Sequence, residues 1–214
     1  VNAGNSIASG GNYNVVVGDE AGTAITTGDY NTALGYQAGT AVTTGLYNVA
    51  VGGASLLANT TGASNVAVGT STLAANTTAS SNTAVGYSSL NANTTGTLNT
   101  AVGKDAGLSV TTGTNNTLIG ALAGDALTDA DYNVALGYAA LSTDTLGSLS
   151  VAIGASALLN QNFTSATNAY NVAVGTNAGL SVTTGIQNTL IGGLAGDAIT
   201  TGNNNVAVGK SSLS

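Results

Sequence analysis

Residues 82–98 read NTAVGYSSLNANTTGTL, and the pattern starts again at residue 99 with NTAVGKDAGLSVTTGTN. The motif Asn-x-Ala-x-Gly returns every 17 residues, so we number the positions of the unit from 0, the Asn, to 16. One unit, around Phe163, carries a four-residue insertion. We treat residues 1–214 as a single repeat domain. Its units begin at Asn14, Asn31, Asn48, Asn65, Asn82, Asn99, Asn116, Asn133, Ser150, Asn171, Asn188 and Asn205.

The composition of each unit favours strands and turns over helices. Position 3 is always Val, Leu or Ile, position 4 is always Gly, and positions 12–14 most often read Thr-Thr-Gly. Aliphatic residues that alternate with small ones, bounded by Gly and Thr, are typical of short strands between turns. The sequence therefore predicts an all-β fold, a parallel β-solenoid (β-roll) of about twelve 17-residue coils that stabilise one another by stacking.

Each column of the repeat has an expected role. Successive strand residues face opposite sides, so we expect the aliphatic position 3 to line the interior and positions 0 and 2 to face the other way. The Gly of position 4 should form a corner with positive φ or close backbone approach, and the Asn of position 0 should form a hydrogen-bonded ladder. The residues assigned to these structural roles are Asn14, Asn31, Asn48, Asn65, Asn82, Asn99, Asn116, Asn133, Gly18, Gly35, Gly52, Gly69, Gly86 and Gly103.

Positions 8 and 11 vary together. Where position 8 is Gly, as at Gly107, position 11 is aliphatic, as at Val110. Where position 8 is Leu, as at Leu90, position 11 is polar, as at Asn93. We interpret the exchange as one interior pocket per coil that accepts one branched aliphatic side chain from either position, because a close-packed core tolerates neither two nor none.

The segment SVAIGASA, residues 150–157, and the repeated NVAVG and NTAVG resemble the YadA-like head repeats of trimeric autotransporter adhesins. The longer form NTAVGYSSLNANTTG, residues 82–96, is similar to repeats of phage tail fibres. The resemblance covers nearly the whole chain. It implies a left-handed roll, a parallel homotrimer, and an adhesive or spacer shaft on a bacterial cell surface or a virion tail.

Composition excludes several function classes. The chain has two Lys or Arg and nine acids, a formal net charge of -7, and no His, Cys or Trp. We therefore expect no enzyme activity, no cofactor and no nucleic-acid binding. No apolar run reaches the roughly 20 residues of a membrane span, so we expect no membrane insertion in this segment. Asp125, Asp129 and Asp131 lie close together, but their spacing fits no calcium motif, and we expect no metal site.

Several residues are candidates for recognition. Tyrosines recur at position 16 and at position 5. An exposed aromatic row could stack on sugars, but we favour ordinary packing of these rings beside the strand ends. The insertion offers an irregular loop on a regular scaffold. The recognition candidates are Phe163, Asn162, Tyr36, Tyr87 and Tyr138.

The expected function is a non-catalytic structural or adhesive fibre segment, extracellular or on a virion tail. Its partners would be copies of itself and a host-surface glycan or protein. Two alternatives stay open. The chain could polymerise end to end as a filament subunit through unpaired strand edges, or its Thr-Thr pairs, such as Thr94 and Thr95, could form rows that bind ice.

Overall fold

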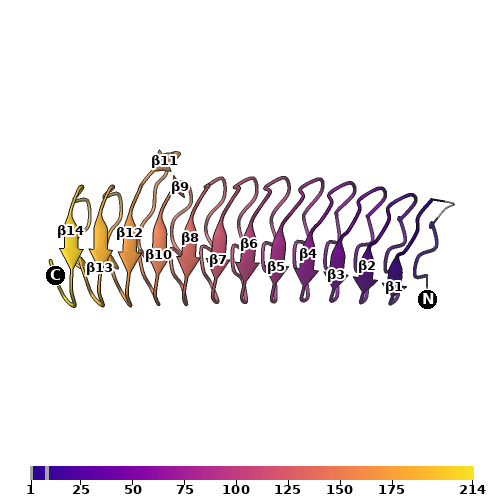
Figure 1. Ribbon diagram of the computed structural model, residues 1–214, viewed down its shortest axis with the longest axis horizontal. Helices are drawn as coiled ribbons and strands as arrows, with labels where there is room; N and C mark the ends of the chain where they lie inside the picture. The colour runs from indigo at the N-terminus through magenta and orange to yellow at the C-terminus, as the bar shows by residue number, and fades with distance from the viewer. Residues whose placement is uncertain (1, 8–9) are drawn as a thin grey trace.

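The computed structural model describes residues 2–7 and 10–214, and it forms a rod of stacked coils. Figure 1 shows the strands side by side in one row, with the two chain ends at opposite ends of the rod. Each coil contributes one three-residue strand to a 12-stranded sheet. The strands of this sheet are β1 (Val15–Val17), β2 (Thr32–Leu34), β3 (Val49–Val51), β4 (Val66–Val68), β5 (Thr83–Val85), β6 (Thr100–Val102), β7 (Thr117–Ile119), β8 (Val134–Leu136), β10 (Val151–Ile153), β12 (Val172–Val174), β13 (Thr189–Ile191) and β14 (Val206–Val208).

All neighbouring strands of the sheet are parallel and pair in the register of the repeat. Val66 of β4 faces Thr83 of β5, 17 residues later, and across the insertion Val151 of β10 faces Val172 of β12. Twelve strands in this order make about eleven turns, which confirms the predicted all-β parallel solenoid. Over the described ranges the chain has no helix, and so no helix that could span a membrane.

The insertion adds a second, two-stranded sheet. β9 (Gly147–Ser148) pairs in parallel with β11 (Thr167–Asn168). Figure 1 shows this pair at the edge of the rod where the strands of the 12-stranded sheet begin. The insertion thus forms a short extra layer beside the coils, and the main sheet runs past it without a break.

The prediction of which strand face is buried was wrong. In the middle strands the position-2 residue is buried, as at Ala84, while positions 1 and 3, as at Thr83 and Val85, are only half buried. The Asn of position 0 is also buried in most coils, as at Asn82. The interior is therefore lined by Asn and Ala, and the aliphatic column at position 3 lies on the outer face of the sheet.

The width of the coil explains the inversion. A single large aliphatic residue per coil, at position 8 or 11, occupies the interior, so position 2 has room only for a small side chain. The exceptions Val16, Leu118 and Leu190 all occur in coils with Gly at position 8. A Cβ added to Gly124 would lie 2.8 Å from Cδ2 of Leu118, which shows that the larger residue uses the space that this Gly leaves.

The exchange between positions 8 and 11 has the expected structural basis. Leu90 and Val110 are fully buried in adjacent coils. A Cβ built on Gly107 would lie 2.9 Å from Cδ2 of Leu90 and 3.4 Å from Cγ2 of Val110, so side chains from both positions converge on one space. The polar residues at position 11 are buried as well. Asn93 donates through Nδ2 to Oδ1 of Asn76, 2.9 Å away, and to the carbonyl oxygen of Gly96.

The corner Gly of position 4 combines positive φ with close contact between coils. Gly103 has φ 139°, and a Cβ on it would lie 2.5 Å from the carbonyl oxygen of Gly120 in the next coil. Both conditions require Gly. Three further columns, at positions 6, 8 and 16, hold non-Gly residues at positive φ, for example Asp105 at 55°, Leu90 at 49° and Leu98 at 60°.

Candidate interaction surfaces

The outer face of the 12-stranded sheet is an aliphatic stripe along the rod, which we call the outer stripe. It is formed by positions 1 and 3, which hold only Val, Thr, Leu and Ile. Leu34 is 45% exposed, Val102 36% and Leu136 43%, although each lies between two neighbouring strands. The position-3 residues are Val17, Leu34, Val51, Val68, Val85, Val102, Ile119, Leu136, Ile153, Val174, Ile191 and Val208.

The backbone behind the outer stripe is held by the Asn column. The Asn31 amide N–H donates to Oδ1 of Asn14, 2.8 Å away, and the same contact joins Asn48 to Asn31. Each Asn also donates through Nδ2 to the carbonyl oxygen of position 14 in its own coil, as from Asn31 to Gly45 at 2.8 Å. These side chains connect the start of each strand to the turn that closes the coil. Their hydrogen-bonding groups are used within the solenoid and are not free to bind a ligand.

The two Thr residues of the Thr-Thr-Gly turn behave differently. The hydroxyl of position 12 is bonded to the next coil, as from Oγ1 of Thr94 to the carbonyl oxygen of Thr111 at 3.2 Å. The hydroxyl of position 13, as at Thr95, is exposed. The turn thus presents one exposed Thr column rather than two. The ice-binding hypothesis depended on paired Thr rows, and a single column is a narrower surface than that.

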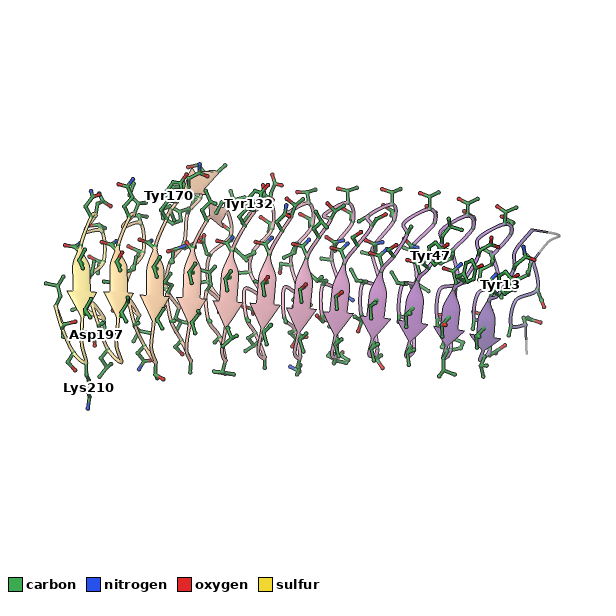
Figure 2. All side chains as sticks on the ribbon, viewed as in Figure 1. Tyr13, Tyr47, Tyr132, Tyr170, Asp197 and Lys210 are labelled. Atoms are coloured by element: carbon green, nitrogen blue, oxygen red, sulfur yellow. The ribbon has the colours of Figure 1, made fainter. Side chains whose placement is uncertain are left out.

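The tyrosines at position 16 form a stack near the N-terminal end of the rod. The ring centroids of Tyr13 and Tyr30 lie 4.8 Å apart, and those of Tyr30 and Tyr47 lie 5.0 Å apart, with interplanar angles of 11° and 9°. Figure 2 shows Tyr13 and Tyr47 at this end, and Tyr132 and Tyr170 further along, near the insertion. Within the stack the facing sides of neighbouring rings cover each other, while the ring edges stay open to solvent.

The tyrosines at position 5 are separate from one another. Tyr36, Tyr87 and Tyr138 follow at intervals of 51 residues, or three coils, and are 56%, 56% and 60% exposed. At about 4.8 Å per coil, successive rings are about 14 Å apart. The carbonyl oxygen of each accepts a hydrogen bond from the next coil, as from the N–H of Asp105 to Tyr87 at 2.9 Å. These three candidates are therefore brought into one straight row with a fixed backbone.

The same column carries both lysines of the chain, Lys104 and Lys210. Lys104 Nζ lies 2.7 Å from Oδ2 of Asp105, and this hydrogen bond raises the pKa of the lysine above its usual value. The pair is local, so Lys104 adds little net charge beside Tyr87 and Tyr138.

A buried polar network, formed by side chains inside the coil, holds the insertion in place. Asp144 Oδ1 accepts the amide N–H of Gly147 at 3.0 Å and of Phe163 at 3.1 Å, while Oδ2 accepts Nε2 of Gln161 at 2.6 Å. Gln161 also donates to Oγ of Ser150 at 3.0 Å and accepts Nδ2 of Asn171 at 2.8 Å. Gln161 therefore bridges the coil in which Ser150 interrupts the Asn column.

The recognition candidates in the insertion divide into buried and accessible residues. Phe163 is only 6% exposed, so its ring packs inside and does not offer a contact surface. Asn162 is half buried, and its Oδ1 accepts the hydroxyl of Thr145 at 3.2 Å. The exposed residues of the loop are Thr164, Ser165 and Ala166, and no pattern in the sequence distinguishes them.

The acids near residue 125 are distributed along the rod and bonded to neighbouring coils. Oδ1 of Asp125 accepts the hydroxyl of Ser142 at 2.6 Å, and Oδ1 of Asp131 accepts the amide N–H of Thr114 at 2.6 Å. No group of three or more His, Cys, Asp or Glu side chains that could hold a metal ion occurs in the described part of the chain. In that part there is also no pocket.

Comparison of the chain with protein-family models, with curated proteins and with solved structures finds no match. The function is therefore argued from the surfaces described above, beginning with the outer stripe.

Proposed function

We propose that this chain is a non-catalytic structural segment of an extracellular fibre, on a bacterial surface or a phage tail, in which copies pack side by side through the outer stripe. One observation carries the proposal. The sheet presents an uncharged face of Val, Leu, Ile and Thr over all twelve strands, with an aliphatic residue at position 3 of each, and side chains such as Leu34 and Leu136 are more than 40% exposed.

The size of the outer stripe favours a partner. At about 4.8 Å per coil the stripe is about 50 Å long, and two side chains per strand cover on the order of 500 Å². A patch of this size is about the largest that a typical monomer exposes, and such patches are often functional. A monomer in water would leave this area hydrated, at a cost of about 25 cal/mol per Å² of apolar surface.

The regularity of the outer stripe favours a copy of the same chain as that partner. Its aliphatic side chains repeat with the coil, at about 4.8 Å along the rod. A partner that contacts all twelve coils must present side chains with the same axial period, and another copy in parallel orientation does so. Closed symmetric assemblies of identical chains are the common outcome of such contacts. The resemblance to trimeric adhesin heads and tail-fibre repeats supports three copies.

The experiment compares charge on the outer stripe with charge elsewhere in the same coils. Val51→Lys with Val85→Lys places two ammonium groups on the stripe, while Thr61→Lys with Thr95→Lys places them on the exposed Thr column. We expect sedimentation to give about three times the chain mass of 20.4 kDa for the unmodified protein and the Thr variant, and a single chain for the Val variant. A wild-type protein that sediments as one chain at high concentration would refute the proposal.

The same preparations separate the two alternatives. A filament that grows end to end would give an open distribution of masses that the Val substitutions leave unchanged. An ice-binding protein would produce thermal hysteresis and shaped ice crystals, and the lysines on the Thr column would remove them. Each result replaces the fibre proposal with a different function.

A further inference from the structure

The exposed tyrosine stack at the N-terminal end of the rod has a chemistry that the structural role does not use. Tyr13, Tyr30 and Tyr47 are 74%, 47% and 56% exposed, and each ring lies face to face with its neighbour at 4.8 or 5.0 Å. We propose that this stack is an oxidative cross-linking site, at which a one-electron oxidant joins neighbouring coils through dityrosine.

The solenoid sets the distance between the rings. The amide N–H of Tyr30 donates to the carbonyl oxygen of Asn12, and that of Tyr47 donates to Asp29, both at 3.0 Å. All three tyrosines share the left-handed backbone, with φ 58–59°. Since adjacent coils are about 4.8 Å apart, successive side chains leave the backbone in one direction at the spacing of stacked rings. The rings are thus held together before any reaction.

The reaction balances with hydrogen peroxide and a haem peroxidase as the oxidant. Each of two phenols loses one electron and one proton from its hydroxyl group and becomes a phenoxyl radical. The radicals form a carbon–carbon bond between ring positions ortho to the oxygens, and the hydrogens on those carbons move to the oxygens and restore both phenols. One peroxide accepts the two electrons and two protons and yields two waters. The exposed rings can tilt toward each other to bring the ortho carbons together.

The other tyrosines provide an internal comparison. Tyr36, Tyr87 and Tyr138 are equally exposed but three coils apart, at about 14 Å. Among the described residues, the stacked ring pairs are Tyr13 with Tyr30 and Tyr30 with Tyr47. Exposure alone therefore does not make the site, and the middle ring belongs to both pairs.

A cross-link here would fasten successive coils of the rod. The chain has no Cys, so it contains no disulfide that could do this. A bond from Tyr13 to Tyr30 closes a loop of one coil and limits the separation of those coils on unfolding, in the way that a disulfide does. The bond lies within one chain, so it does not depend on the lateral association proposed above.

The test treats dilute full-length protein with horseradish peroxidase and hydrogen peroxide, then digests it with an endoproteinase that cleaves before Asp. Cleavage before Asp19 and Asp29 separates Tyr13, on peptide 1–18, from Tyr30, on peptide 29–104. We expect a species with the summed mass of these two peptides less two hydrogens, together with dityrosine fluorescence. The yield of this species per chain should not change with protein concentration. The Val51→Lys, Val85→Lys variant, which should not associate, should give the same yield.

Two matched variants decide the outcome. Tyr30→Phe keeps a stacked ring but removes the shared phenol, so we expect at least a tenfold loss of the linked peptide pair. Tyr87→Phe removes an exposed but isolated phenol and should leave the yield unchanged. A linked 1–18 and 29–104 species that persists in Tyr30→Phe, or cross-links that form only between chains in wild type, would overturn the proposal.

Discussion

Leu90→Gly, alone and together with Asn93→Val, tests the shared interior pocket most sharply. Leu90 is fully buried, and removing a buried Leu side chain costs about 2 to 5 kcal/mol. Its backbone has φ 49°, a conformation that costs a residue with a Cβ about 1 to 2 kcal/mol and Gly almost nothing. The cavity and the relieved strain act in opposite directions, so we expect a net loss of about 2 to 3 kcal/mol in the free energy of unfolding for the single change.

The second substitution should recover much of that loss. Val at position 93 reproduces the Gly107 and Val110 pairing of the next coil and refills the space. It also removes the Asn93 Oδ1 atom, which is buried without a hydrogen-bond partner. The cost is one orphaned acceptor, Oδ1 of Asn76, worth about 1 kcal/mol, because the Gly96 carbonyl keeps its bond from Asn82 at 2.8 Å. We therefore expect the double variant to regain about half or more of the lost stability.

The assay is equilibrium denaturation followed by circular dichroism at one fixed protein concentration, since association adds to apparent stability. Asn93→Val alone is the control, and it should be destabilised because two aliphatic side chains would then share one space. A double variant no more stable than Leu90→Gly would refute the shared pocket.

Three further substitutions test separate features of the coil. In the same denaturation assay, Gly103→Ala should lower the free energy of unfolding by more than about 3 kcal/mol, because of strain at φ 139° and a clash with the next coil. Gly53→Ala is the control and should be nearly neutral, because its added Cβ would meet nothing closer than 3.9 Å. Leu98→Asn should raise stability by about 0.5 to 1 kcal/mol in thermal melts, because Asn tolerates the φ of 60° better and this Leu side chain is 57% exposed; a decrease would contradict the strain argument. Gln161→Ala should cost about 2 to 4 kcal/mol, since it leaves the buried Asp144 carboxylate without a partner for Oδ2, and unchanged amide exchange in the insertion would show that the network does not anchor it.

Much of the fold followed from the period alone. A constant spacing of 17 residues, with one Gly at a fixed position, predicts stacked coils in one register, and the pairing of Val66 with Thr83 is of this kind. The exchange between Leu90 with Asn93 and Gly107 with Val110 located the interior pocket because packing density restricts both positions together. These features depend on constraints that every coil repeats, so one sequence samples each of them many times.

The face of the strand could not be assigned in the same way, because a period of two is satisfied with either face inside. The assumption that the larger aliphatic residue is buried placed Val85 inside and Ala84 outside, the reverse of the structure. A usable signal was present, since large residues at position 2, such as Leu118, occur only with Gly at position 8. That correlation indicates that positions 2 and 8 share the interior.

The details of the candidate surfaces were less accessible to sequence reasoning. Nothing local to Phe163 indicates that its ring is buried, because this depends on how Asp144, 19 residues earlier, holds the backbone of the insertion. The stack of Tyr13, Tyr30 and Tyr47 did have a signal in the sequence, because these tyrosines fall in adjacent coils. Stacking follows from the interval between residues in units of coils, one for these and three for Tyr36 and Tyr87.

The most direct test of an outward aliphatic face that binds copies of the chain is the thiol reactivity of a single introduced cysteine on β4. The chain has no Cys, so Ala67→Cys and Val68→Cys each report on one face of the same strand. In the Val51→Lys, Val85→Lys background we expect Val68→Cys, which is half buried, to react with a maleimide in the folded protein, and Ala67→Cys, which is buried, to react only on unfolding. Without the lysines, Val68→Cys should become protected as protein concentration rises. If, in the lysine background, the Ala67→Cys protein reacts while the Val68→Cys protein is protected, then position 2 is exposed and position 3 is buried. That result would contradict the assignment of the strand faces and the proposed contact surface.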